Sequence, residues 1–436
     1  MKLKMFMIFA FLLFAGCAKN EIRTFVNQAD ETTNSSDVLL SSIDVEASEP
    51  AIASARDGAF VVWVEHHADK TADVFVQKID SNGKIINEKT RVNSVAGSAT
   101  AWRGDPPTIA VAPDNAIYIG WTARVNSPDG HAANVMLSVS RDDGRSFAAP
   151  VKVNDDSMPA VHGMHSLAID KNGNVLMAWL DERYLKNTAG NQIDLMRHDF
   201  HFQKVSDENP TAAKPMQHSE ANREVYFAVS KDGGKSFSPN KKIAENVCPC
   251  CKTALLTAND NRVYAAWRQV LPGDFRHIAV AASADGGANF GAPVIVSDDQ
   301  WQIAGCPVSG ASLARGSDNS LKVIWFTAGA NGATGIYQTN STDNGKTFAP
   351  RKLISAGSAF GTPAVFSGES NSSGLAWSAN EKLYTTVLTD QINDLKPNEL
   401  GVGELPAAAI IGKQMVLAFV KKEKDQHGVW LKFVGY

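Results

Sequence analysis

The chain has 436 residues, 44% of them hydrophobic, and a formal net charge of −4 at pH 7. This near balance, with no basic tract, excludes the electrostatic footprint of a nucleic-acid-binding protein. The size and the hydrophobic content fit one large all-β domain made of repeats, because repeat rings outgrow the usual domain size.

The N-terminus predicts a place in the cell envelope of a bacterium. Residues 5–15 form an apolar run that has the length of a secretory signal and is too short to span a bilayer. Phe14-Ala15-Gly16-Cys17 resembles the box of bacterial lipoproteins. The resemblance implies that residues 1–17 are a signal peptide with a lipid-modified Cys17, and that the protein is an outer-membrane lipoprotein facing the periplasm or the cell surface. An ordinary cleaved signal is the alternative.

Residues 18–37 are polar and rich in Asn, Thr and Ser, so we expect a flexible tether. No later apolar run is long enough to cross a membrane. The expected membrane contact is therefore the lipid anchor only.

From residue 38 to residue 436 the pattern predicts a ring of β-sheets. Short apolar strands that end in tryptophan recur at intervals of mostly 58 residues, and the longest interval contains an insertion at about 183–222. Each unit has four short antiparallel strands and is too small to bury its own core, so radial stacking into a β-propeller is expected. The aromatic markers are Trp63, Trp121, Trp179, Trp267, Trp325, Trp377 and, as a seventh copy, Phe419.

The number of blades is six or seven, with seven slightly favoured. The last unit ends with the strand Gly428–Val434 and lacks one strand, while Val38–Ile43 is an unassigned strand ahead of the first blade. Pairing these two strands would close the ring and remove both open edges. Six blades result if the units of Trp377 and Phe419 are halves of one blade.

A second motif, Ser-x-Asp-x-Gly-x-x-Phe, occurs four times, at residues 140–147, 230–237, 283–290 and 341–348. The carboxylate suits a tight turn in which it accepts bonds from backbone amides, and glycine takes a dihedral that other residues avoid. We expect hairpin corners with a structural role only. Their aspartates are Asp142, Asp232, Asp285 and Asp343.

These boxes resemble the Asp boxes, or BNR repeats, of the sialidase-like β-propellers, and they cover most of the chain after residue 37. Sialidases of that family are glycoside hydrolases that clamp the substrate carboxylate with three arginines, the first in an Arg-Ile-Pro run. This chain has Ser48-Glu49-Pro50 at that place, which puts sialidase activity in doubt. Weak candidates for a rebuilt clamp follow second strands of the repeats: Arg183, Arg268 and Arg276.

The cysteines give a sharper prediction than the arginines. Cys248, Cys250 and Cys251 precede one predicted inner strand, and Cys306 precedes the next, so both groups are expected at one mouth of the central channel. The preceding blade contributes Met164 and His165 at the equivalent place. Three interpretations are open: structural disulfides, a thiolate-rich site for a soft metal, and a redox pair at the Cys-x-x-Cys spacing of Cys248 and Cys251.

The sequence therefore predicts a lipid-anchored propeller that binds a ligand at its channel mouth, copper first and zinc second. The predicted metal ligands are Cys248, Cys250, Cys251, Cys306, His165 and Met164. Alternatives are an exo-acting sialidase-type hydrolase and a non-catalytic scaffold for a glycan or an envelope protein, with structural disulfides and no cofactor. The oligomeric state is left open.

Overall fold

The computed structural model describes residues 37–100, 104–127, 130–185, 223–303, 307–316, 320–367, 373–388 and 397–435. The expected signal peptide with Cys17, nearly all of the tether, most of the insertion and Cys306 lie outside these residues. Within the described ranges all regular elements are β-strands, and none of them contains a helix long and apolar enough to cross a membrane.

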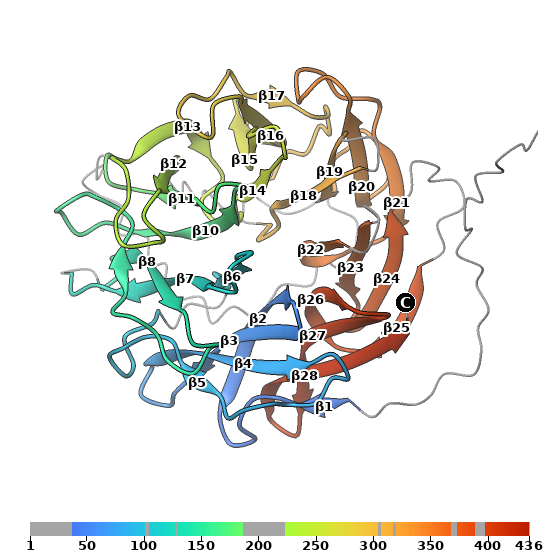
Figure 1. The fold of residues 1–436 in the computed structure, drawn as a ribbon. Helices are drawn as coiled ribbons and strands as arrows, with labels where there is room; N and C mark the ends of the chain where they lie inside the picture. Colours follow the sequence, from blue (N-terminus) through green and yellow to red (C-terminus); the bar gives the residue numbers. More distant parts are fainter. Residues whose placement is uncertain are drawn as a thin grey trace, which may run out of the picture. The chain divides into compact units, whose positions relative to one another are not determined.

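Strands that follow one another in the chain pair antiparallel and form successive sheets (Figure 1). Four sheets contain four consecutive strands each. They are β2 (Glu46–Ala55), β3 (Gly58–His66), β4 (Ala72–Asp80) and β5 (Thr90–Arg91); β6 (Thr108–Val111), β7 (Ile117–Arg124), β8 (Ala133–Ser140) and β9 (Val151–Lys152); β18 (Ala311–Arg315), β19 (Leu321–Thr327), β20 (Gly335–Ser341) and β21 (Lys352–Ala356); β22 (Phe360–Ser367), β23 (Ser373–Ala379), β24 (Lys382–Leu388) and β25 (Asn398–Val402).

A fifth sheet has eight strands and consists of two groups of four. The groups are β10 (His162–Ile169), β11 (Val175–Asp181), β12 (Arg223–Ser230) and β13 (Lys241–Val247), and β14 (Ala254–Thr257), β15 (Val263–Leu271), β16 (Phe275–Ser283) and β17 (Val294–Ile295). A single residue pair, Val247 with Gln269, joins β13 to β15.

The last sheet joins the two ends of the described chain. It contains β26 (Glu404–Ile411), β27 (Gln414–Glu423), β28 (Gln426–Gly435) and, beside β28, the N-terminal strand β1 (Val38–Leu39). Val38 pairs with Leu431 and Leu39 with Trp430. The predicted pairing of the N-terminal strand with the last strand is therefore present.

The first strands of the successive groups lie innermost. β2, β6, β10, β14, β18, β22 and β26 each contact the next in this order, and β26 contacts β2 in turn. Figure 1 shows these strands around one axis. The predicted all-β fold of antiparallel four-stranded sheets is confirmed.

The tryptophans that mark the repeat fill the spaces between neighbouring sheets. Trp63, Trp179, Trp267, Trp325 and Trp377 lie in second strands and are among the largest fully buried side chains, and Phe419 is fully buried in β27. A second strand has a neighbouring sheet on both faces, so its residues are apolar in continuous runs rather than in alternation. Burial of each such side chain stabilises the folded state by on the order of 2–3 kcal/mol.

All four boxes form the same hydrogen-bonded turn between the third and fourth strands. In the first copy, the Ser140 hydroxyl donates to Asp142 at 2.8 Å, and Asp142 accepts from the Ser146 amide at 2.9 Å. The box glycine has a positive φ, for example +90° at Gly287, where an added Cβ would lie 2.4 Å from the ring of Phe227 in the preceding group. Glycine is required both by this dihedral and by the close packing.

Candidate functional site

Three cysteines lie on a short loop between β13 and β14. The amide of Cys248 donates to the carbonyl of Arg268 at 2.9 Å and extends the pairing of β13 with β15. Pro249 has no amide hydrogen and ends this pairing. The amide of Thr253 then donates to the carbonyl of Met164 in β10 at 3.0 Å. The loop thus crosses from the outer strand of one group to the inner strand of the next.

The three sulfurs of this loop form one buried cluster. Cys248 and Cys251 are 0% exposed and Cys250 is 5% exposed. The Sγ atoms of Cys248 and Cys251 are 2.9 Å apart, those of Cys248 and Cys250 are 3.8 Å apart, and all three lie within 4.8 Å of one another. Met164 packs in the same hydrophobic cluster.

The cysteines differ in their oxidation state. Cys250 is disulfide-bonded, whereas Cys248 and Cys251 are free. The sulfur bonded to Cys250 lies outside the described residues, and so does Cys306, the fourth predicted ligand. The predicted thiolate at Cys250 is therefore absent in this oxidation state, because a disulfide sulfur has no proton to lose. Two free thiols remain among the described cysteines.

Two buried arginines surround the free pair. Nη1 of Arg276 donates to Sγ of Cys248 at 3.3 Å. The guanidinium of Arg268 donates from Nε to the carbonyl of Ser309 at 3.0 Å and from Nη2 to the carbonyl of Phe326 at 2.9 Å. Its orientation is therefore fixed by backbone. Nε of Arg276 is buried and has no hydrogen-bond partner in the described part of the chain.

These contacts separate the pKa values of the two thiols. Burial disfavours the thiolate of Cys248, but the hydrogen bond from Cys251 and the charge of Arg276 outweigh it and lower the pKa of Cys248 to about 6. Burial and the Cys248 sulfur raise the pKa of Cys251. These opposite shifts favour the thiolate at Cys248 and the thiol at Cys251. The thiolate is the form of cysteine that binds metals and acts as a nucleophile.

His165, another predicted ligand, faces a different neighbour. Its ring is fully buried, and Nδ1 lies 3.5 Å from Oδ1 of Asp105. The same Oδ1 accepts from the amide of Met164 at 2.8 Å, where the backbone has a φ of +53°. Asp105 therefore holds the bend in β10 that separates the two side chains. Among the described residues, no contact joins His165 to a cysteine.

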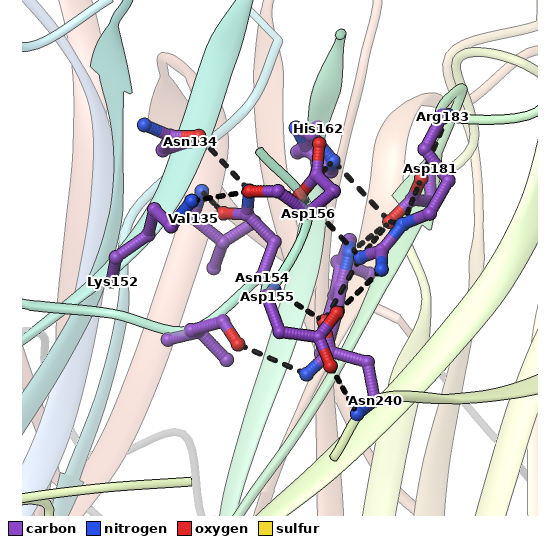
Figure 2. Close-up of polar contacts among 12 residues, drawn as sticks. Asn134, Val135, Lys152, Asn154, Asp155, Asp156, His162, Asp181, Arg183 and Asn240 are labelled. Atoms are coloured by element: carbon purple, nitrogen blue, oxygen red, sulfur yellow. Dashed lines mark hydrogen bonds and ion pairs between the residues drawn. The ribbon is translucent and has the colours of Figure 1, made fainter. Parts of the chain in front are cut away.

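Arg183, the first of the predicted carboxylate-binding arginines, belongs to a polar network between β8, β10 and β11 (Figure 2). Its Nη2 donates to Asp181 at 2.8 Å and to Asn240 at 2.9 Å, and its Nη1 donates to Asp155 at 2.6 Å. Three protein groups thus already occupy the guanidinium. Arg268 and Arg276 are also engaged, by backbone carbonyls and by Cys248.

His162 adds a buried charge to the same network. Its Nε2 lies 3.3 Å from Asp156 and 3.4 Å from Asp181. Burial disfavours the charged ring, but the two carboxylates outweigh it and raise the pKa of His162 to about 9. Burial acts in the opposite direction on both carboxyl groups, yet His162 holds the pKa of Asp156 and of Asp181 below their usual range. Each charged group of this network therefore lies close to an opposite charge.

Sequence reasoning missed that part of this network is a repeated structural element. A buried tryptophan donates to an acid, the acid pairs with a cation, and the cation lies over an aromatic ring that stacks on the tryptophan. The sequence signal was an acid two residues after tryptophan in the first two sets. The sets are Trp63, Glu65, Lys89 and Phe75; Trp179, Asp181, Arg183 and Tyr226; and Trp325, Asp299, Arg351 and Tyr337.

Comparisons with known proteins show the fold. No family model and no curated protein matches the chain. A protein of unknown function from Dyadobacter fermentans is similar at 14% identity and a TM-score of 0.50, over 92% of this chain and 97% of its own. The Hadza microbial sialidase Hz136 is similar at 13% identity and a TM-score of 0.51, over 84% and 74%. At these identities the likeness is one of β-propeller fold alone.

Proposed function

We propose that the protein binds a soft metal ion at Cys248 and Cys251, copper(I) first and zinc(II) second. The observation that carries the proposal is the pair of free, fully buried sulfurs 2.9 Å apart. Thiolates select soft ions, and Met164 adds a thioether to the same cluster. Cys250 brings a third sulfur within 4.8 Å when its disulfide is reduced.

The charges around the pair favour a monovalent ion. Two thiolates with copper(I) carry one net negative charge, which the adjacent guanidinium of Arg276 balances. Two thiolates with zinc(II) carry none and would leave both buried guanidiniums, those of Arg268 and Arg276, without a balancing charge, whereas copper(I) leaves one. Buried charges are stable only when paired. Copper(I) is therefore the ion that best fits the described residues.

The test is a count of metals and thiols on the purified protein after growth with copper and zinc. We expect about one copper per chain, retained against a moderate chelator, and loss of that copper in Cys248→Ser/Cys251→Ser. Lys252→Gln is the matched control, because it changes the same loop and keeps all sulfurs. A metal-free wild type whose thiols are all in disulfides contradicts the proposal.

We also propose seven blades and a lipid anchor at Cys17. The seven inner strands and the single residue pair between the halves of the eight-stranded sheet support the count. The apolar run at residues 5–15 and the box that ends at Cys17 support an outer-membrane lipoprotein of the bacterial envelope. Cys17→Ala is expected to abolish incorporation of labelled palmitate. Unchanged labelling contradicts the anchor.

Sialidase-type glycoside hydrolysis is the alternative that the fold suggests. The engagement of Arg183 and Arg268 by protein groups argues against a clamp for a sugar carboxylate. Glu49, at the place of the family's first arginine, is buried and pairs with His66 at 2.8 Å. We therefore expect no release of a fluorescent aglycone from a sialoside. Release that Arg276→Met abolishes would favour the hydrolase.

A further inference from the structure

A groove lies between the corners of the first and second boxes, residues 140–147 and 230–237. We propose that it binds a small organic anion with an apolar body, such as an aromatic sulfonate or carboxylate. The groove has a volume of about 650 Å³, which is within the range of about 300–1,000 Å³ that small-molecule sites occupy. Its lining residues come from 139–151 and 233–235 and lie outside the cysteine loop, so the proposal is independent of metal binding.

Much of the lining is apolar. Val139 near the end of β8, Phe147 of the first box and Val151 of β9 contribute side chains to it. Each of the three is only partly buried by the protein, so part of its apolar surface faces water. An apolar body placed against these side chains would remove that surface from water, which favours binding.

Two exposed cations line the groove, one from each box. They are Arg141 of the first box and Lys235 of the second. Arg141 makes an ion pair with Asp114 at 3.3 Å, but both side chains are exposed, and such a pair contributes little in water. Lys235 makes no ion pair within the described part of the chain. Both cations are therefore available to an anion.

The carboxylate in the lining is engaged inside its own box. Asp142 accepts from the Ser140 hydroxyl at 2.8 Å, and from the amide and the hydroxyl of Ser146 at 2.9 and 2.5 Å. Two cations and this one carboxylate leave the lining with one net positive charge. A ligand with one anionic group and an apolar body is complementary to both properties of the groove.

A glycine of the second box lets Arg141 reach this place. An added Cβ on Gly233 would lie 2.6 Å from Nη2 of Arg141, which donates to the Gly233 carbonyl at 3.4 Å. The same box position holds Asp143 in the first copy and Asn344 in the fourth, with φ of +65° and +66°, close to the +73° of Gly233. The turn itself therefore accepts a side chain, and the glycine is needed for the approach of Arg141.

The test uses two dyes that share one apolar body. Anilinonaphthalene sulfonate carries an anionic group, and phenylnaphthylamine is its uncharged counterpart. In fluorescence titrations of the purified protein we expect about one saturable site per chain for the sulfonate. Its affinity should exceed that of the uncharged dye by about tenfold or more and should fall as salt is added.

Arg141→Glu and Lys235→Glu should each weaken binding of the sulfonate by about tenfold or more. Lys346→Glu is the matched control, because Lys346 has the place of Lys235 in the fourth box and does not line the groove. Gly233→Asn adds no charge and copies the residue of the fourth box. It should displace the Arg141 guanidinium and weaken the sulfonate, with urea unfolding close to that of wild type.

The proposal is overturned if wild type shows no saturable binding of the sulfonate or equal affinity for the two dyes. Sulfonate binding that stays unchanged in Arg141→Glu and Lys235→Glu overturns it as well. Vesicles of phosphatidylglycerol separate a free anion from a lipid. Co-sedimentation of wild type with these vesicles that Lys235→Glu abolishes would assign the groove to a membrane surface and overturn the proposal of a free anion.

Discussion

Two buried charged regions involve residues of the eight-stranded sheet, and they are built in opposite ways. Around His162 every charge has an opposite charge: Asp156 and Asp181 face the imidazole, and Arg183 bridges to Asp155. Around Cys248 two guanidiniums surround thiols, and no carboxylate pairs with either arginine in the described residues. In the first region the charged side chains pair with one another. In the second, negative charge that balances the arginines appears only when the thiols ionise.

Whether a buried charge has an opposite charge beside it separates structural residues from candidate functional ones better than their position in the sequence does. Arg183 and Arg276 both follow a second strand and were equal candidates from the sequence. Arg183 is one of three cations that occupy the same place in different sheets, whereas Arg276 contacts a reactive sulfur. A buried charge that the protein has not neutralised is the better indicator of a ligand.

The largest effect is expected from Asp181→Ala. This change removes one of the two carboxylates that the buried His162 and Arg183 share, leaving Asp156, and it removes the acceptor of the Trp179 indole. We therefore expect a loss of about 3–5 kcal/mol in the free energy of unfolding by urea. Asp155→Ala is the control, because Asp155 binds the same arginine from a half-exposed position and should cost about 1 kcal/mol or less. Equal losses of unfolding free energy in Asp181→Ala and Asp155→Ala would contradict the special role of the buried carboxylate.

The next effect is a pH dependence that His162 confers. Its pKa rises from 6.5 unfolded to about 9 folded, so its stabilisation is complete below pH 6.5 and is lost as the pH rises through about 9. The advantage of wild type over His162→Gln should shrink by about 3 kcal/mol across this range. Cys248, whose pKa is lowered, acts in the opposite direction there, so the difference between the two proteins is the quantity to measure. A constant difference contradicts the charged histidine.

Arg276→Met tests the region around Cys248, and its expected effect is on metal affinity. Loss of the cation that balances the site should weaken copper(I) affinity by about 10–100-fold in competition with a colorimetric chelator, as removal of an outer-shell partner does elsewhere. Arg183→Met should lose stability and keep copper affinity. If Arg183→Met weakened copper affinity and Arg276→Met did not, Arg183 rather than Arg276 would support the metal site.

The smallest effect is expected from Arg183→Lys. Lys89 already occupies the equivalent place in the first sheet, 4.3 Å over the ring of Phe75. The lysine should keep the stacking and lose part of the bonding to Asp155 and Asn240, at about 1 kcal/mol of unfolding free energy. A loss as large as that of Asp181→Ala would mean that the two sets are not equivalent.

The repeat was readable from the sequence because burial of a second strand is a local property. An apolar run that ends at Trp179 or Trp267 predicts a buried second strand, whichever repeat contains it. The box turns were readable for the same reason, since Ser140, Asp142 and Ser146 satisfy one another within a few residues.

The site was only partly readable. The clustering of Met164 with the cysteines followed from equivalent positions in neighbouring repeats. The contact of Arg276 in β16 with Cys248 on the loop after β13 joins residues that are 28 positions apart, and no local pattern encodes it. His165 was placed with the cysteines from its equivalent position in the preceding repeat, whereas Nδ1 of its ring lies 3.5 Å from Oδ1 of Asp105. A structural disulfide was one of the three interpretations left open, and the sequence did not decide which of the cysteines would be oxidised.

The pairing of β1 with β28 has a consequence for biosynthesis. The partner of Val38 is Leu431, so the final sheet stays incomplete until almost all of this sequence has been made. Contacts of such separation form late and leave an unpaired edge exposed in the meantime. A prematurely terminated product therefore keeps β1 without its partner strand, and only synthesis through β28 supplies that partner.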